Sequence, residues 1–169
     1  MRPIVLSILL VVMHVLESTL FQYIRIGGVG PNFMIMIIVS FALLRGSKEG
    51  MMIGAGAGLL YDLSFGLHIG PTLLSYMLIG FVCGKLNQNF YRENFIIPFI
   101  CTLCASLFYS MVNIIALVLR GELAFRYFIK SIVIPETIYT ITLSLIVYQL
   151  AYLLNEKIEN AERGSRNIF

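Results

Sequence analysis

The chain has 169 residues, of which 59% are hydrophobic and only 12% are charged, and its formal net charge is +3. A soluble domain carries about half apolar and about a quarter charged residues, and a domain of this size keeps too much surface exposed to hide the excess. The composition therefore excludes a water-soluble fold. A net charge this small, without a basic stripe, excludes a nucleic-acid-binding protein.

Six apolar runs follow one another along the chain, separated by short polar segments, and predict an all-α integral membrane protein, a bundle of about six transmembrane helices. The alternative count is five spans plus an interfacial helix. This alternative rests on the connector of residues 121–130, whose Phe125, Tyr127 and Phe128 suit the headgroup zone of a bilayer. The predicted runs are Pro3–Ile24, Asn32–Leu44, Gly50–Gly66, Thr72–Leu86, Phe95–Leu119 and Ser131–Leu154.

The second, third and fourth runs are shorter than the ~20 residues that a membrane span prefers. They are interpreted as core helices shielded by longer neighbours, or one of them is re-entrant. A polar link, residues 45–49, separates the second run from the third. Residues 1–154 are predicted to form a single transmembrane domain, and residues 155–169 a charged cytoplasmic tail that extends the last helix.

The distribution of Lys and Arg over the loops predicts that both termini lie in the cytoplasm. With six spans and the N-terminus inside, eight basic residues fall on the cytoplasmic side and four on the outer side. The cytoplasmic set is Arg2, Arg45, Lys48, Lys85, Arg92, Lys157, Arg163 and Arg166, and the outer set is Arg25, Arg120, Arg126 and Lys130.

A stripe of small residues runs along the third run, where Gly50, Gly54, Gly58 and Asp62 recur every four residues and so share one face of a helix. Glycines at this spacing form a groove that lets another backbone approach closely. Two interpretations stay open: a seam with another helix of this chain, or a seam for the helix of a partner. A GxxxG pattern in the fourth run, residues 80–84, is interpreted as helix packing.

Asp62 is the most informative single residue of the stripe. A carboxylate inside a span is costly and is by default a functional-site hypothesis. It either caps the turn that follows it or binds a partner. The substitution Asp62→Asn separates these, because an amide keeps most hydrogen bonding and loses the charge.

Four further polar residues lie inside apolar runs. His14 and Glu17 share a helix face and are interpreted as a buried or interfacial pair that interacts internally or with Arg25. Asn113 lies in the middle of a run, where it is able to hydrogen-bond across helices. Glu136 follows a proline near the start of the last run, where a carboxylate complements the positive end of the helix dipole.

Catalytic, cofactor and metal sites are not predicted, because the chain lacks a nucleophile–base set, a zinc motif and a phosphate-binding loop. Cys83, Cys101 and Cys104 lie inside apolar runs, without His ligands or a thioredoxin-like context, and are interpreted as packing residues. Most of the tyrosines lie near run ends and are interpreted as interfacial anchors. They are Tyr76, Tyr91, Tyr109, Tyr127, Tyr148 and Tyr152.

The glycine-stepped third run carries a family resemblance. The segment from Gly50 to Asp62, followed by a glycine turn over residues 66–70, resembles the hallmark of the rod shape-determining protein family MreD. The prolines that precede the second and last runs, Pro31 and Pro135, also resemble that family's pattern. Asn32 departs from it, since the family's proline is often followed by an acid.

The resemblance implies a non-enzymatic scaffold in the bacterial cytoplasmic (inner) membrane. Members of the family associate with the single-span protein MreC as subunits of the cell-elongation machinery. Through MreC they connect MreB filaments inside the cell to the peptidoglycan synthase RodA and its transpeptidase partner outside. On this resemblance the glycine–aspartate stripe holds either the bundle or the MreC helix, and self-association stays open.

The layout of six glycine-rich helices also resembles the S-components of energy-coupling-factor vitamin transporters. Those proteins bind a small molecule in an outward-facing pocket, which needs aromatic and polar groups that converge near the outer surface. Tyr61, Asp62 and His68 could begin such a pocket, but the sequence shows no second cluster to complete it.

Overall fold

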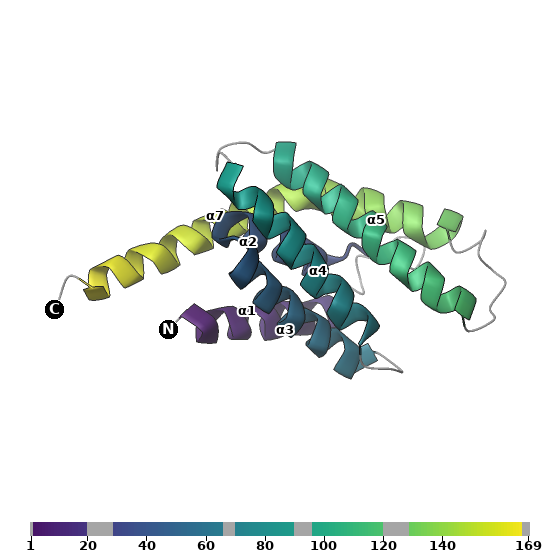
Figure 1. Ribbon diagram of the computed structural model, residues 1–169, viewed down its shortest axis with the longest axis horizontal. Coiled ribbons are helices and arrows are strands. Elements are labelled where there is room, and N and C mark those ends of the chain that lie inside the picture. The colour runs from purple at the N-terminus through teal and green to yellow at the C-terminus, as the bar shows by residue number, and fades with distance from the viewer. Residues whose placement is uncertain (1, 20–28, 66–69, 90–95, 120–128, 167–169) are drawn as a thin grey trace.

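The protein is described by a computed structural model that covers residues 2–19, 29–65, 70–89, 96–119 and 129–166. Within these residues the regular elements are helices, which form a single bundle (Figure 1). Six are α-helices: α1 (Arg2–Thr19), α2 (Phe33–Arg45), α3 (Ser47–Phe65), α4 (Pro71–Lys85), α5 (Ile96–Leu119) and α7 (Ile134–Arg166). A 3-10 turn, Leu86–Asn89, follows α4, and a π-helical turn, Ile129–Val133, leads into α7.

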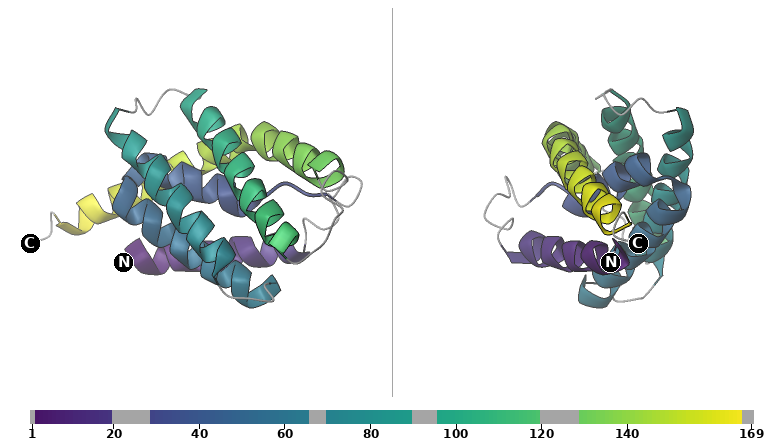
Figure 2. Two further views of the ribbon diagram at one scale, coloured as in Figure 1. Left: turned by 45° about the vertical axis from the view of Figure 1, so that its right-hand side comes forward. Right: turned by 90° about the vertical axis from the view of Figure 1, so that its left-hand side faces the viewer.

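The centre of the bundle is α2, a helix of 13 residues. Every side chain from Phe33 to Leu44 is buried, and α2 contacts each of the other five α-helices. The views in Figure 2 show those helices arranged around it. A helix this short is about 20 Å long, less than the ~30 Å of a bilayer core, so α2 is a core helix shielded by longer neighbours.

A single residue, Gly46, separates α2 from α3. Its φ of 92° lies in the left-handed region that favours glycine. The Gly46 N–H donates to the carbonyl of Ala42 at 2.8 Å, and its carbonyl accepts from Gly50 N–H at 2.9 Å. The expected polar link over residues 45–49 is therefore wrong for Ser47 onward, because those residues form the first turn of α3.

In the described part of the chain, two helices are long and apolar enough to cross a membrane by length and composition, over Ile96–Ala116 in α5 and Ile134–Ile158 in α7. Shorter apolar helices cover Leu6–Thr19, Phe33–Arg45 and Pro71–Lys85. The outer helices also expose large apolar side chains, which a bilayer solvates at no cost. Examples are Val12, Leu63, Leu78, Met111 and Ile146.

The last helix continues without a break through Leu154 to Arg166. Figures 1 and 2 show its C-terminal part, in yellow, projecting beyond the other helices, at the end of the molecule where α1 begins. Pro135 and Glu136 lie in the first turn of α7, as the sequence predicts, directly after the π-helical turn. The predictions made for Arg25, His68 and the connector of residues 121–128 lie outside the described residues, and the number of spans stays a prediction.

Three tyrosines contradict the interpretation as interfacial anchors. The exposed fractions of Tyr76, Tyr109 and Tyr148 are 0%, 7% and 1%, so these rings belong to the core. A tyrosine can be buried when its hydroxyl finds a partner inside the protein, as that of Tyr76 does. Tyr152 packs partly against the same core. Tyr91 and Tyr127 lie outside the described residues.

Candidate functional site

The glycine stripe of α3 faces α4 of the same chain. A Cβ atom built on Gly50 would lie 2.6 Å from the carbonyl oxygen of Gly80, and one on Gly58 would lie 2.5 Å from Leu73 Cα. A Cβ on Gly54 would overlap the backbone carbonyl of Tyr76. Only hydrogen fits at these three positions, so the two helix backbones are in direct contact.

The contact is reciprocal, because α4 carries its own glycines. A Cβ on Gly80 would overlap the Gly50 carbonyl, and one on Gly84 would overlap the Ser47 backbone at the start of α3. The two helices therefore meet in a close backbone contact with glycines on both sides. We call this contact the α3–α4 seam and define it by Gly50, Gly54, Gly58, Gly80 and Gly84. The helix of a partner has no room in it unless α4 moves away.

Asp62 closes the seam at its far end. The residue is 2% exposed, and its Oδ2 accepts hydrogen bonds from the backbone N–H of Gly70 at 2.8 Å and of Leu73 at 3.1 Å. These groups belong to the start of α4, where backbone N–H groups lack partners within the helix and the helix dipole favours a negative charge. Asp62 thus caps α4 from the neighbouring helix.

Removal of this cap is expected to destabilise the hairpin. Asp62→Leu leaves two buried N–H groups without an acceptor and lowers the free energy of unfolding by about 2 kcal/mol. Asp62→Asn keeps an acceptor oxygen and costs about 1 kcal/mol, for the lost charge. Unfolding in mild-detergent micelles, followed by circular dichroism as dodecyl sulfate is added, measures both. Equal losses for the two variants would contradict the cap.

A second group of polar side chains converges inside the bundle around Asn32. The Asn32 side-chain oxygen accepts from Ile35 N–H at 3.0 Å and so caps α2. Its side-chain amide donates to the Tyr76 hydroxyl at 3.1 Å, and its backbone N–H donates to Thr140 Oγ1 at 3.0 Å. Thr140 Oγ1 donates in turn to the backbone carbonyl of Glu136 at 2.7 Å. One buried residue thus connects α2, α4 and α7.

Aromatic rings extend this group across the bundle. The ring of Tyr76 lies 5.1 Å from that of Tyr109 and 6.2 Å from that of Tyr61, measured between centroids. Tyr61 in turn lies edge-on to His14 at 6.4 Å, and His14 Nε2 forms a hydrogen bond of 2.8 Å with Ser64 Oγ. The rings link α1, α3, α4 and α5 in one row.

The sequence predicts four intramembrane polar residues, His14, Glu17, Asn113 and Glu136, and only some of them belong to this group of side chains. Glu136 is part of it through its backbone carbonyl, which accepts from Thr140 Oγ1 at 2.7 Å, while Glu17 lies on α1, three residues after His14. The side-chain amide of Asn113 donates to the Tyr109 carbonyl at 3.1 Å, a bond within α5 rather than across helices. We call Asn32, Tyr61, Tyr76, Tyr109, Glu136 and Thr140 the polar cluster.

Two central members of the polar cluster, Asn32 and Tyr76, are not among the site residues that the sequence predicts. Asn32 is treated there only as a departure from a family pattern, and Tyr76 as an interfacial anchor. A signal for Asn32 exists, since an asparagine directly before an apolar helix is a preferred N-cap. Its contact with Thr140, 108 positions away, leaves no local pattern in the sequence.

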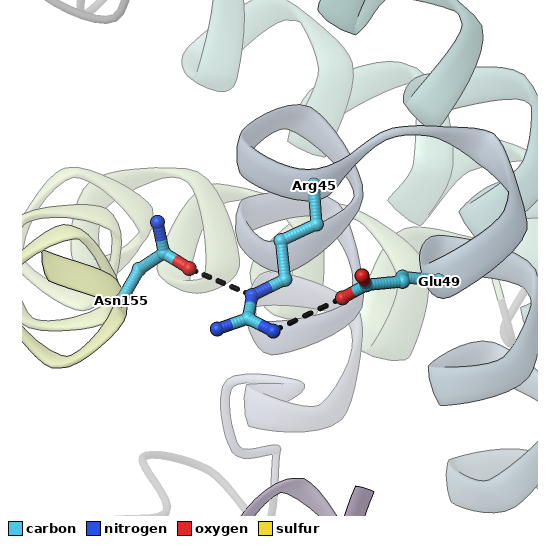
Figure 3. A network of polar contacts seen from close by, with 3 residues as sticks. All are labelled: Arg45, Glu49 and Asn155. Atoms are coloured by element: carbon cyan, nitrogen blue, oxygen red, sulfur yellow. Dashed lines mark hydrogen bonds and ion pairs between the residues drawn. The ribbon is translucent and has the colours of Figure 1, made fainter. Parts of the chain in front are cut away.

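A polar clamp lies at the C-terminal end of α2 (Figure 3). The side chain of Arg45 is only 7% exposed. Its Nε donates to Asn155 Oδ1 at 2.7 Å, and its Nη1 pairs with Glu49 Oε2 at 3.0 Å. A planar guanidinium serves two acceptors in fixed directions, so Arg45 joins α2 to α3 and to α7. With Asn32 at the other end, α2 is fixed by polar groups at both ends.

An apolar groove, here called the α5–α7 groove, opens between α5 and the π-helical turn that leads into α7, with a volume of about 490 Å³. Its α5 wall follows helical spacing, so it is one continuous face of that helix. Within the described part of the chain no group of three or more His, Cys, Asp or Glu residues is arranged to hold a metal ion. The residues that line the groove are Leu107, Ser110, Met111, Ile114, Ile115, Val118, Leu119, Ile129 and Val133.

Comparison with known proteins identifies the family. Residues 1–158 match the family described as rod shape-determining protein MreD. No curated protein and no solved structure was found to match the chain. The match covers the glycine seam, Asp62, the polar cluster and both helices that are long enough to cross a membrane. The chain therefore belongs to the MreD family of rod shape-determining membrane proteins.

Proposed function

We propose that this protein is a non-enzymatic scaffold of the rod-shape machinery and that it holds the helix of an MreC-like single-span protein in the α5–α7 groove. The role in rod-shape determination follows from the family. The groove is the observation that carries the binding site, because it is open and apolar while the α3–α4 seam is already filled by the protein's own backbone.

The groove has features that suit a transmembrane helix. Within a bilayer, helices associate through close packing and occasional hydrogen bonds, because lipid removes the hydrophobic drive. The exposed fractions of Leu107, Met111, Ile115 and Val118 are 47%, 62%, 50% and 55%, so one long ridge of α5 is available for such packing. Ser110 is buried beside that ridge and offers a hydroxyl.

We further propose that both termini lie in the cytoplasm, on the side of the MreB filaments. The start of α1 and the end of α7 lie at the same end of the molecule (Figure 1), which supports an even number of crossings. In this arrangement the groove lies near the outer surface, because it adjoins the C-terminal half of α5 and the start of α7. RodA and its transpeptidase partner are reached from the outer side through the bound MreC-like protein.

Site-specific photocrosslinking tests the location of the partner. A photoreactive phenylalanine derivative is placed at Met111 in the groove or at Leu78 on α4, which is also exposed to lipid. The protein is produced together with the MreC-like protein of the same organism. We expect a crosslink from Met111 and none from Leu78. Crosslinking from Leu78 alone would move the partner to α4, and crosslinking from neither position would remove this partner from both faces.

A second candidate function, the S-component of a vitamin transporter, is favoured by the polar cluster. That cluster supplies the convergent tyrosines and polar groups that a small-molecule site needs, from the N-cap of α2 and from α3, α4, α5 and α7. Mild-detergent purification of the native protein distinguishes the two functions. Recovery of an MreC-like protein favours the scaffold, and recovery of a coupling ATPase module with a bound vitamin favours the transporter.

A further inference from the structure

Three small hydroxyl side chains recur every four residues along α5 and so form one stripe on that helix. They are Thr102, Ser106 and Ser110, with exposed fractions of 2%, 1% and 5%. The stripe faces α7 at its centre, because Ser106 Oγ donates to Thr137 Oγ1 at 3.3 Å. A hydroxyl buried in a membrane protein needs a hydrogen-bond partner from the protein, since the hydrocarbon of lipid offers none.

Ser110 differs from the other two members of the stripe. Thr102 Oγ1 donates to the carbonyl of Pro98 at 2.8 Å, and Ser106 bonds to α7. The Ser110 hydroxyl forms no hydrogen bond with any residue that the structure describes. Although it is only 5% exposed, Ser110 lines the α5–α7 groove, and it is the single polar residue among the described residues that do so. A partner for this hydroxyl therefore has to come from the groove.

The depth of Ser110 decides which occupant of the groove supplies that partner. Ser110 lies within the segment Ile96–Ala116, which is long and apolar enough to cross a membrane. It is six residues from the end of this segment, or about 9 Å along the helix. An acyl chain at this depth has neither a donor nor an acceptor and would leave the hydroxyl unsatisfied. A transmembrane helix with a polar side chain would satisfy it.

We propose that Ser110 is the specificity-determining residue of the α5–α7 groove and that it hydrogen-bonds an Asn, Gln, Ser or Thr side chain within the span of the bound helix. This inference rests on the proposed function, in which the groove holds an MreC-like protein. The apolar walls accept many apolar helix faces, because such contacts are non-directional. A single hydroxyl among them fixes the register and rotation of the bound helix, and it disfavours helices that would leave it unpaired.

Matched substitutions of Ser110 and Ser106 test the proposal, because both replace serine by alanine on the same stripe. Binding of the dye-labelled MreC-like protein of the same organism is titrated in mild-detergent micelles, and unfolding is followed by dodecyl sulfate titration. Ser110→Ala is expected to bind about threefold to tenfold more weakly, with an unchanged unfolding midpoint. Ser106→Ala loses a bond inside the protein, so it is expected to unfold at less dodecyl sulfate and to keep the native affinity.

A pairwise test identifies the group on the partner. Each Asn, Gln, Ser or Thr within the partner's span is replaced by alanine in turn. One replacement is expected to weaken binding to the native protein and to have no effect on binding to Ser110→Ala, because the two side chains share one hydrogen bond. Ser110→Cys keeps the size of the side chain and only a weak hydrogen bond. It is expected to show intermediate affinity, and it replaces Ser110→Ala if that variant does not fold.

The outcomes separate this inference from the proposed function. Native affinity in Ser110→Ala, with crosslinking from Met111 retained, would overturn the role of Ser110 and leave the helix in the groove. A lower unfolding midpoint for Ser110→Ala would show that the hydroxyl already has a partner within the chain, and this too would overturn the inference. Failure of the MreC-like protein to bind the native protein would overturn both the inference and the proposed function.

Discussion

Replacing Gly54 by leucine is expected to abolish the native packing of α3 against α4. Its Cβ would overlap the Tyr76 backbone carbonyl, and Met77 Cα lies only 3.1 Å from the same point. A backbone does not move aside as a flexible side chain does, so the overpacking cost exceeds about 3 kcal/mol. Dodecyl sulfate titration of the purified variant in mild detergent, followed by circular dichroism, measures the loss, together with the yield of monodisperse protein.

Gly56→Ala is the matched control, because it adds a methyl group to the same helix on another face. A Cβ on Gly56 would meet only the Leu10 Cδ1 atom, at an ordinary contact distance of 3.5 Å. Alanine also favours a helix over glycine by up to about 1 kcal/mol, so this variant is expected to be at least as stable as the native protein. A Gly54→Leu variant as stable as Gly56→Ala would contradict the seam.

This result affects how partner binding is assayed. Gly58 has the same environment as Gly54, since its Cβ would lie 2.5 Å from Leu73 Cα. A large residue at Gly58 therefore disrupts the protein's own hairpin, and loss of a partner from that variant does not locate the partner's binding site. Probes on exposed positions, such as Met111, leave the hairpin intact and answer the question directly.

The seam shows how far sequence reasoning reaches in this protein. The four-residue spacing of Gly50, Gly54 and Gly58 predicts a close approach of another backbone, because only glycine leaves that room. The spacing does not say which backbone, since a helix of the same chain and a helix of a partner leave the same pattern. The structure places α4 there, with Gly80 and Gly84 on the opposing side.

The polar cluster shows where such reasoning stops. Its members are single polar residues within apolar runs, and each one has an ordinary local explanation as a cap or an anchor. What distinguishes them is their convergence from separate helices, such as the contact between Asn32 and Tyr76, 44 positions apart. No period or spacing encodes that convergence. Arg45 is similar, because its partner Asn155 lies 110 positions away in an expected solvated tail.

Together the polar cluster and the clamp explain how α2, a short and almost entirely apolar helix, is held in register. From Phe33 to Leu44 the surface of α2 is apolar except for Ser40, whose hydroxyl bonds within the helix to the Met36 carbonyl, and apolar contacts are non-directional. Packing alone would therefore tolerate small shifts along the helix axis. Asn32 and Arg45 form directional bonds at opposite ends, to α4 and α7 and to α3 and α7 respectively. These bonds fix α2 along its axis, and with it the helices that surround it.

Asn32→Leu is therefore expected to be the most damaging substitution outside the seam. It removes the cap on Ile35 N–H and leaves the Tyr76 hydroxyl without its Asn32 partner. A lost cap costs about 1 kcal/mol, and each buried group left unsatisfied costs about 1 kcal/mol or more. The combined loss in the free energy of unfolding is about 2 kcal/mol or more, measured by the same titration.

Tyr76→Phe is the control for Asn32→Leu, because it deletes one hydroxyl and keeps the cap and the ring packing. Its expected cost is about 1 kcal/mol. The double variant is expected to lose less than the sum of the two single variants, because residues that share a hydrogen bond are energetically coupled. Strictly additive losses would show that Asn32 acts only as a helix cap. A sub-additive result would establish that the bond between α2 and α4 is part of what holds the central helix.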